Sequence, residues 1–177
     1  MTIEELINKA KAVEKGEKLD LSSDEDLSIG IMNLISIEEH LFFTAQKTQK
    51  TQYYDLLNEV RDMRKQLLKQ IIKDYEGEVW CISKHLLAGC VRFMEVGTKM
   101  LTKGDNTLAH NMFSKAYKLY SMFWALNLKL ISPEDVKRED SPNINIQKDE
   151  ETPKSAKVSM MDKIGEVVKK LVDCCKE

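Results

Sequence analysis

The sequence has few of the residues that break helices or build disulfide and metal frameworks. Its 177 residues include only 3 prolines and 7 glycines. Proline and glycine interrupt helical runs, so their scarcity is compatible with long helices. The 4 cysteines include no Cys-x-x-Cys pair, which argues against a zinc-ribbon or thioredoxin-type motif.

An excess of charge of either sign is also missing. The chain has 27 Lys and Arg residues against 29 Asp and Glu residues, which gives a formal net charge of −2. This balance provides no global basic field to hold nucleic acid, so nucleic acid is not an expected partner. The apolar runs are too short for a membrane span, and the acidic N-terminal segment does not resemble a secretion signal. We therefore expect a cytoplasmic protein with reduced thiols.

Motifs of the common enzyme classes are absent from the sequence. It contains no glycine-rich phosphate loop and no Gly-x-Ser-x-Gly nucleophile motif. The repeated Glu-x-x-His pairs of di-metal helical bundles are missing too. Cys81 could act as a nucleophile with His85 or His40, but helical spacing rarely supplies a third residue to orient such a pair. We expect a protein without catalytic activity.

Apolar side chains do recur with the period of an α-helix along most of the chain. Capping signals support several boundaries: Ser23 precedes three acidic residues, and Gly104 and Asp105 are typical of a helix stop followed by an N-cap. The pattern predicts four long helices, at about residues 24–47, 52–75, 78–102 and 106–131. Short connections between long helices favour antiparallel neighbours, so the predicted fold is all-α, an antiparallel four-helix bundle.

The sequence divides into four parts. Residues 1–21 are predicted to form a short N-terminal helix with its connection, and residues 22–132 the helical bundle. Residues 133–156 are polar and rich in proline, which is typical of a disordered linker. The apolar period returns in residues 157–177 and predicts an amphipathic C-terminal helix, tethered by the linker. We expect this helix to pack on the bundle or to bind a partner.

One acidic residue falls on a predicted core face. Glu38 lies among apolar side chains in the first long helix, where a carboxylate must be paired, protonated or bound to something. With a turn near residues 48–51, Glu38 lies opposite Arg61 and close to Arg64, so an ion pair with either is predicted. The alternative is that Glu38 faces a cavity as a ligand or base. Asn127 also falls on an apolar face and needs a hydrogen-bond partner.

A polar stripe on the third long helix is a candidate metal site. Glu78, Cys81 and His85 fall on one side of this helix, and the spacing of the last two allows both to reach one ion. His40 or His110 would have to supply a further ligand from another helix, and zinc is the ion that this set suits. The alternative is that the stripe is simply the solvated face of the helix.

Small and aromatic residues in segment 90–123 have a familiar spacing. They are Gly97, Gly104, Ala109, Phe113 and Ala116. On these residues the segment resembles a single tetratricopeptide unit, with Ser121 in place of the usual final proline. No second copy follows, so the peptide-binding groove of that family is not implied. The resemblance implies a closely packed helix hairpin.

These observations favour a helical interaction or scaffold protein that binds a protein partner or forms a homo-oligomer. An alternative is a helical bundle that binds a metal or small ligand through Glu38, Cys81, His85 and His40. A second alternative is weak binding of nucleic acid by the basic surface of the helix at residues 52–75. That surface carries Lys65, Lys69 and Lys73, although such clusters are more often solvated.

Overall fold

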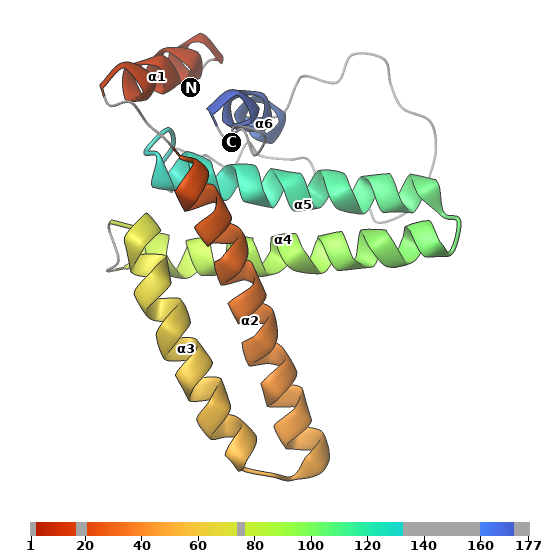
Figure 1. Cartoon of the computed structure of the whole chain (residues 1–177). Coiled ribbons are helices and arrows are strands. Elements are labelled where there is room, and N and C mark those ends of the chain that lie inside the picture. Colours follow the sequence, from red (N-terminus) through yellow and green to blue (C-terminus); the bar gives the residue numbers. More distant parts are fainter. Residues whose placement is uncertain (1–2, 17–20, 74–76, 133–159, 172–177) are drawn as a thin grey trace, which may run out of the picture.

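The structure is a computed structural model that describes residues 3–16, 21–73, 77–132 and 160–171. Every regular element within these ranges is an α-helix, and no strand is present there (Figure 1). The helices are α1 (Ile3–Gly16), α2 (Ser22–Thr48), α3 (Gln52–Ile71), α4 (Glu78–Thr102), α5 (Asn106–Asn127) and α6 (Met160–Leu171). The all-α prediction is confirmed.

The ends of the long helices follow local chemistry. Helix α2 ends before Gln49, which adopts a left-handed conformation with φ of 56°. Gly104 provides the left-handed turn after α4, with φ of 80°. The Asp105 carboxylate then caps α5 by accepting a hydrogen bond from the Leu108 amide at 3.0 Å. Helix α3 ends earlier than its apolar period predicts, because the backbone of Ile72 is extended.

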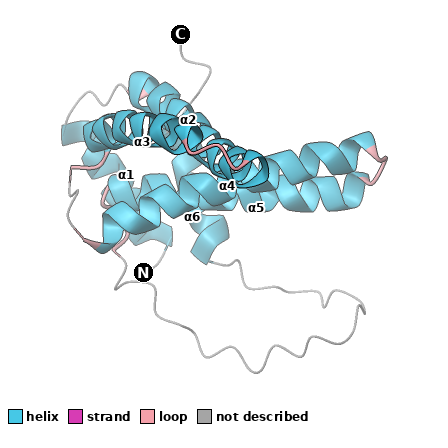
Figure 2. Cartoon of the chain, turned by 90° about the horizontal axis from the view of Figure 1, so that it is seen from below, coloured by secondary structure: helices cyan, strands magenta, loops and turns pink. Residues whose placement is uncertain are grey.

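The four long helices form two antiparallel hairpins. Helices α2 and α3 make one hairpin, and α4 and α5 make the other. The hairpins cross steeply, so most of the α2–α3 hairpin projects away from α4 and α5 (Figures 1 and 2). The predicted helices and their antiparallel pairing are therefore present, but the four helices do not lie side by side along their lengths. The crossing depends on contacts between distant residues, which the apolar period of each helix does not specify.

The core lies where the two hairpins cross. Tyr120, Phe123 and Trp124 of α5 form an aromatic cluster, and the ring centroids of Phe123 and Trp124 are 5.3 Å apart. The Ser28 hydroxyl of α2 lies 2.8 Å from the Tyr120 hydroxyl, which ties the first hairpin to the second. Other fully buried side chains pack against the cluster: Ile31, Leu68, Ile72, Leu87 and Leu130.

Helix α6 covers the second hairpin. It packs on α5 and also contacts α1, and it buries Ile164, Val167 and Val168. An ion pair between Lys118 and Asp162, at 2.6 Å, adds a polar contact between α5 and α6. The predicted linker and the last residues of the predicted tail lie outside the described residues. In the part of the chain that is described, no helix is long and apolar enough to cross a membrane.

Candidate functional site

Glu38 and Arg64 join the two helices of the first hairpin. The Arg64 Nε atom donates to Glu38 Oε1 at 2.6 Å, and Nη2 donates to Oε2 at 3.2 Å. Arg64 is 4% exposed, and Arg61 approaches the same carboxylate at 3.8 Å. Paired N–H groups on both carboxylate oxygens make a strong, directional contact. Glu38 thus has arginine partners inside the hairpin.

Asn127 joins the two helices of the second hairpin. Its Nδ2 atom donates to Ser83 Oγ at 3.1 Å and to the Phe123 carbonyl at 2.8 Å. Ser83 is fully buried on α4, so the amide supplies it with a partner across the helix interface. The sequence identified Asn127 as a group in need of a partner, but it gave no signal that Ser83 would be that partner.

The candidate metal ligands lie on the surface. Glu78, Cys81 and His85 of α4 and His40 of α2 are all exposed. Among the residues that the structure describes, no group of three or more His, Cys, Asp and Glu side chains is placed to hold a metal ion. The exposed position of the α4 stripe matches a solvated helix face, and the zinc site stays a prediction.

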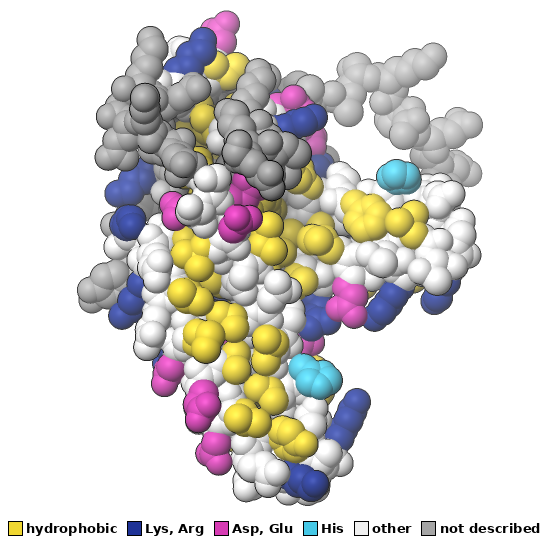
Figure 3. All heavy atoms as spheres, viewed as in Figure 1, with side chains coloured by type: hydrophobic (Ala, Val, Ile, Leu, Met, Phe, Trp, Pro, Cys, Tyr) yellow, Lys and Arg dark blue, Asp and Glu magenta, His cyan; other side chains and the backbone are white. Residues whose placement is uncertain are grey.

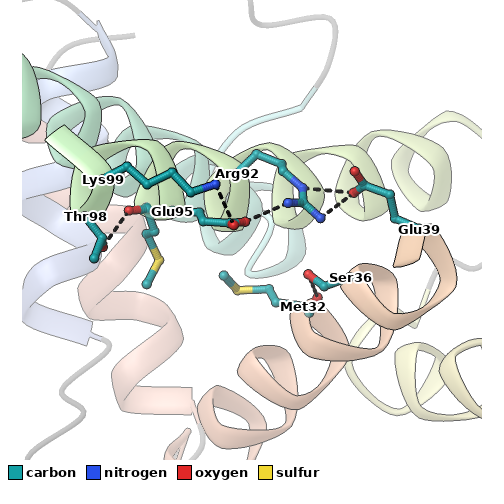
Figure 4. Close-up of polar contacts among 8 residues, drawn as sticks. Met32, Ser36, Glu39, Arg92, Glu95, Thr98 and Lys99 are labelled. Atoms are coloured by element: carbon teal, nitrogen blue, oxygen red, sulfur yellow. Dashed lines mark hydrogen bonds and ion pairs between the residues drawn. The ribbon is translucent and has the colours of Figure 1, made fainter. Parts of the chain in front are cut away.

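A charged network closes the corner between the hairpins (Figure 4). Arg92 of α4 reaches across to Glu39 of α2, with its Nη2 atom 2.6 Å from the carboxylate. Arg92 also pairs with Glu95 at 2.6 Å, and Lys99 pairs with Glu95 at 3.1 Å. Hydrogen bonding and the two cations lower the pKa of the Glu95 carboxyl group. These contacts identify the side of α2 that faces α4.

The opposite side of the first hairpin is apolar, and we call it the outer face. It contains three exposed residues and four half-buried ones: Ile37, Leu56 and Met63, with Leu34, Leu41, Val60 and Leu67. Spacings of three, four and seven residues align them along α2 and α3. Ile37 is two residues from Glu39, so it points to the far side of the helix. In Figure 3, apolar side chains follow the hairpin as a continuous ridge.

The other exposed side of α3 is basic and borders a pocket. The pocket has a volume of about 290 Å³ and lies between α3 and the start of α4. Its lining consists of Arg61, Arg64, Lys65, Lys69, Trp80 and Lys84. Five of these six residues are cationic, although the whole chain has a net charge of −2. The sequence showed the α3 cations but not that Trp80 and Lys84 would join them.

Two titratable groups near the crossing are the buried Cys90 and the half-buried Tyr120. Burial raises the pKa of the Cys90 thiol from 9.0 to about 11. The pKa of Tyr120 is also raised, mainly by burial and against the lowering effect of its hydrogen bond with Ser28. Both groups are therefore protonated at neutral pH, and their surroundings are those of packed core residues. Cys81, by contrast, is an exposed thiol.

The helix hairpin implied by the tetratricopeptide resemblance is present as α4 and α5. The Phe113 ring lies against Gly97, so closely that an added Cβ atom would lie 2.5 Å from the ring. Comparison with known proteins adds no relative, because the chain matches no family model, no curated protein and no solved structure.

Proposed function

We propose that this chain is a non-enzymatic interaction protein that self-associates through the outer face of its α2–α3 hairpin. In the dimer, two such hairpins pack face to face and form a four-helix bundle between copies. The observation that carries the proposal is the exposure of Ile37, Leu56 and Met63, which are 43%, 47% and 52% exposed. Scattered apolar residues are normal on a protein surface, but an aligned ridge is typical of an interaction site.

The hairpin buries only part of its apolar surface within one chain. Its inner side meets α4 near the crossing, whereas nothing among the described residues covers the outer face. Completing the burial of a half-exposed Ile, Leu or Met side chain contributes on the order of 1 kcal/mol. A second copy of the α2–α3 hairpin would cover the outer face, because four helices enclose an apolar core and two do not.

The polar residues around the ridge favour a second copy of the same chain. They are mostly uncharged: Asn33, Thr44, Gln66 and Gln70, although the acidic residues Asp55 and Glu59 lie along the α3 edge. A surface with so little charge does not repel its own copy across a two-fold axis, where each residue meets an equivalent surface. A strongly acidic partner would find no complementary charge on this face.

The size of the outer face sets the expected strength of the dimer. Two helices side by side present roughly 20 Å by 30 Å, given helix diameters of about 10 Å and about 1.5 Å of rise per residue. A face-to-face pair then buries about 1,200 Å² in total, near the lower limit of stable interfaces. We expect a dimer that forms at micromolar concentrations and dissociates on dilution.

Mass in solution as a function of protein concentration tests the proposal. Light scattering should give twice the chain mass of 20.4 kDa at about 100 μM, where a micromolar dimer is nearly complete. The double variant Ile37→Glu, Met63→Glu places charges on the ridge and should stay at the mass of one chain. A matched control, Val96→Glu, changes an exposed apolar residue of α4 and should leave the dimer intact.

Three results would contradict the proposal. The first is a single-chain mass for the unmodified protein at about 200 μM, far above any micromolar dissociation constant. The second is a dimer that the double variant leaves unchanged. The third is equal loss of the dimer in the Val96 control. Circular dichroism of each variant shows that the helices remain folded.

A further inference from the structure

The basic pocket between α3 and α4 has features of a site for a small ligand. Arg61, Lys65 and Lys69 recur every fourth residue along α3, and Lys84 faces them from α4. Cations that converge on one pocket from two helices favour an anionic ligand.

Among the residues that the structure describes, the acidic groups near the pocket are either paired or exposed. Glu38 is held by Arg64 and lies near Arg61, and Asp62 pairs with Lys65 at 3.0 Å. The Asp62–Lys65 pair is on the surface, where such pairs are weak and exchange readily with other ions. Glu78 lies in the same first turn of α4 as Trp80 and is exposed to solvent. Among the described residues, Lys84 has no ion pair.

Trp80 indicates that the ligand contains a planar ring as well as an anionic group. Trp80 alone is uncharged among the described lining residues, and it is half-buried in the first turn of α4. An indole face offers a stacking surface for a planar ring, and cations beside it suit the oxygens of a phosphate group. Guanidinium and ammonium groups together bind phosphate strongly, the first by paired N–H donors and the second as point charges.

We infer that this pocket binds a nucleotide, with phosphate oxygens on Arg61, Lys65, Lys69 and Lys84 and the base against Trp80. The volume of about 290 Å³ lies near the lower end for ligand pockets, which suits a single nucleotide better than a larger ligand. Arg64 also lines the pocket and acts as a positioning residue, because its part-buried pair with Glu38 fixes the α2–α3 spacing. The pocket lies on the side of α3 opposite the outer face, so the inference does not depend on self-association.

Calorimetric titration of the full chain with ATP, AMP and inorganic phosphate tests this inference. We expect ATP to bind more tightly than AMP, because it carries more charge, and inorganic phosphate to bind at least about tenfold more weakly than AMP. Affinity should fall as salt rises, because the contacts are mainly ionic. No binding of ATP at millimolar concentration would overturn the inference, as would equal affinity for AMP and inorganic phosphate.

Variants of the lining residues locate the site. Lys65→Gln with Lys69→Gln preserves helix propensity and should lower ATP affinity at least about tenfold. Trp80→Leu should reduce AMP affinity by a similar factor while leaving phosphate binding unchanged. Two exposed lysines outside the pocket, Lys103 and Lys115, provide the control: changing both to Gln should leave affinity unchanged. The assignment would be overturned if the Lys103 and Lys115 control bound ATP as weakly as the pocket variant does. Unchanged AMP affinity in Trp80→Leu would also overturn it.

An oligonucleotide distinguishes a single nucleotide unit from a nucleic-acid strand. A single-stranded octamer should bind no more than a few-fold tighter than AMP, because only one unit enters the pocket. A gain of a hundredfold or more would mean that phosphates follow the α3 cations along the helix, and it would overturn the small-ligand inference. The Ile37→Glu, Met63→Glu variant should keep full ATP affinity. Loss of ATP binding therefore tests the pocket, and mass in solution tests the dimer, independently of each other.

Discussion

The two hairpins of this protein complete their packing in different ways. In the α4–α5 hairpin, Gly97 admits the Phe113 ring and Gly89 admits Leu119, so the helices approach closely. Helix α6 then covers part of α5. In the α2–α3 hairpin a buried ion pair, Glu38–Arg64, lies at the helix interface, and large apolar side chains remain on the outer face.

The difference indicates which hairpin leaves an aligned apolar face uncovered within one chain. Apolar contact between close helices and a covering helix buries much of the α4–α5 interface within one chain, although Met94, Val96 and Leu108 remain exposed. A buried ion pair contributes little net stability but fixes how two helices align, because each charge needs the other. The α2–α3 hairpin is thus well aligned but incompletely buried, and this favours a role in binding.

The largest expected effect comes from removing one partner of the ion pair. Arg64→Leu leaves the Glu38 carboxylate, which is 15% exposed, without its closest cation. We expect a loss of about 3 kcal/mol in unfolding free energy, at the lower end for a broken buried pair because Arg61 is near. Urea unfolding followed by circular dichroism measures it. Arg61→Leu is the control and should cost less than about 1 kcal/mol. If Arg64→Leu also cost less than about 1 kcal/mol, the alignment of α2 and α3 would not depend on the Glu38–Arg64 pair.

The next effect concerns the close approach in the other hairpin. Gly97→Leu forces the larger side chain against the Phe113 ring and should cost about 2 kcal/mol through overpacking. Gly30→Ala is the matched control, because a Cβ atom there meets nothing within 4 Å. The control should stabilise α2 by about 0.5 kcal/mol or more through helix propensity. Equal melting temperatures for the two variants would remove the contrast between the hairpins.

Alkaline pH should weaken the second hairpin through its buried thiol. The pKa of Cys90 is raised from 9.0 to about 11, so below pH 9 the thiol is protonated in both states and adds no pH dependence. Between pH 9 and about 11 only the unfolded chain ionises, and stability falls by roughly 1–2 kcal/mol. Comparing Cys90→Ala with the unmodified protein isolates this slope, since Tyr120 acts in the same direction in both. An identical slope in the two proteins would contradict the prediction.

The smallest effect concerns the link between the hairpins at their corner. Arg92 and Glu39 are 43% and 40% exposed, and pairs of this kind contribute about 0.5 kcal/mol. Arg92→Gln should therefore lower unfolding free energy by no more than about 1 kcal/mol, and the loss should shrink as salt is raised. Lys73→Gln, on an exposed lysine at the end of the first hairpin, is the control. A loss of several kcal/mol would mean that this surface network fixes the crossing.

The helices themselves were accessible from the sequence, because apolar period and capping act within a few residues of each other. The same local geometry places Glu38 opposite Arg61 and Arg64, given only a short turn between two helices. The crossing of the hairpins was not accessible, since it depends on contacts such as Ser28 with Tyr120, far apart in the chain. The pocket was hidden for the same reason: Trp80 and Lys84 meet the α3 cations only after α3 and α4 pack.

The contact between α1 and α6 has a consequence for the order of folding. These helices are separated by about 140 residues of chain, whereas each hairpin joins helices that are adjacent in sequence. Loop closure over short separations is entropically easier, so the hairpins should form early and the α1–α6 contact late. Hydrogen exchange should accordingly be fastest in α1 and α6, which open while the two hairpins remain closed.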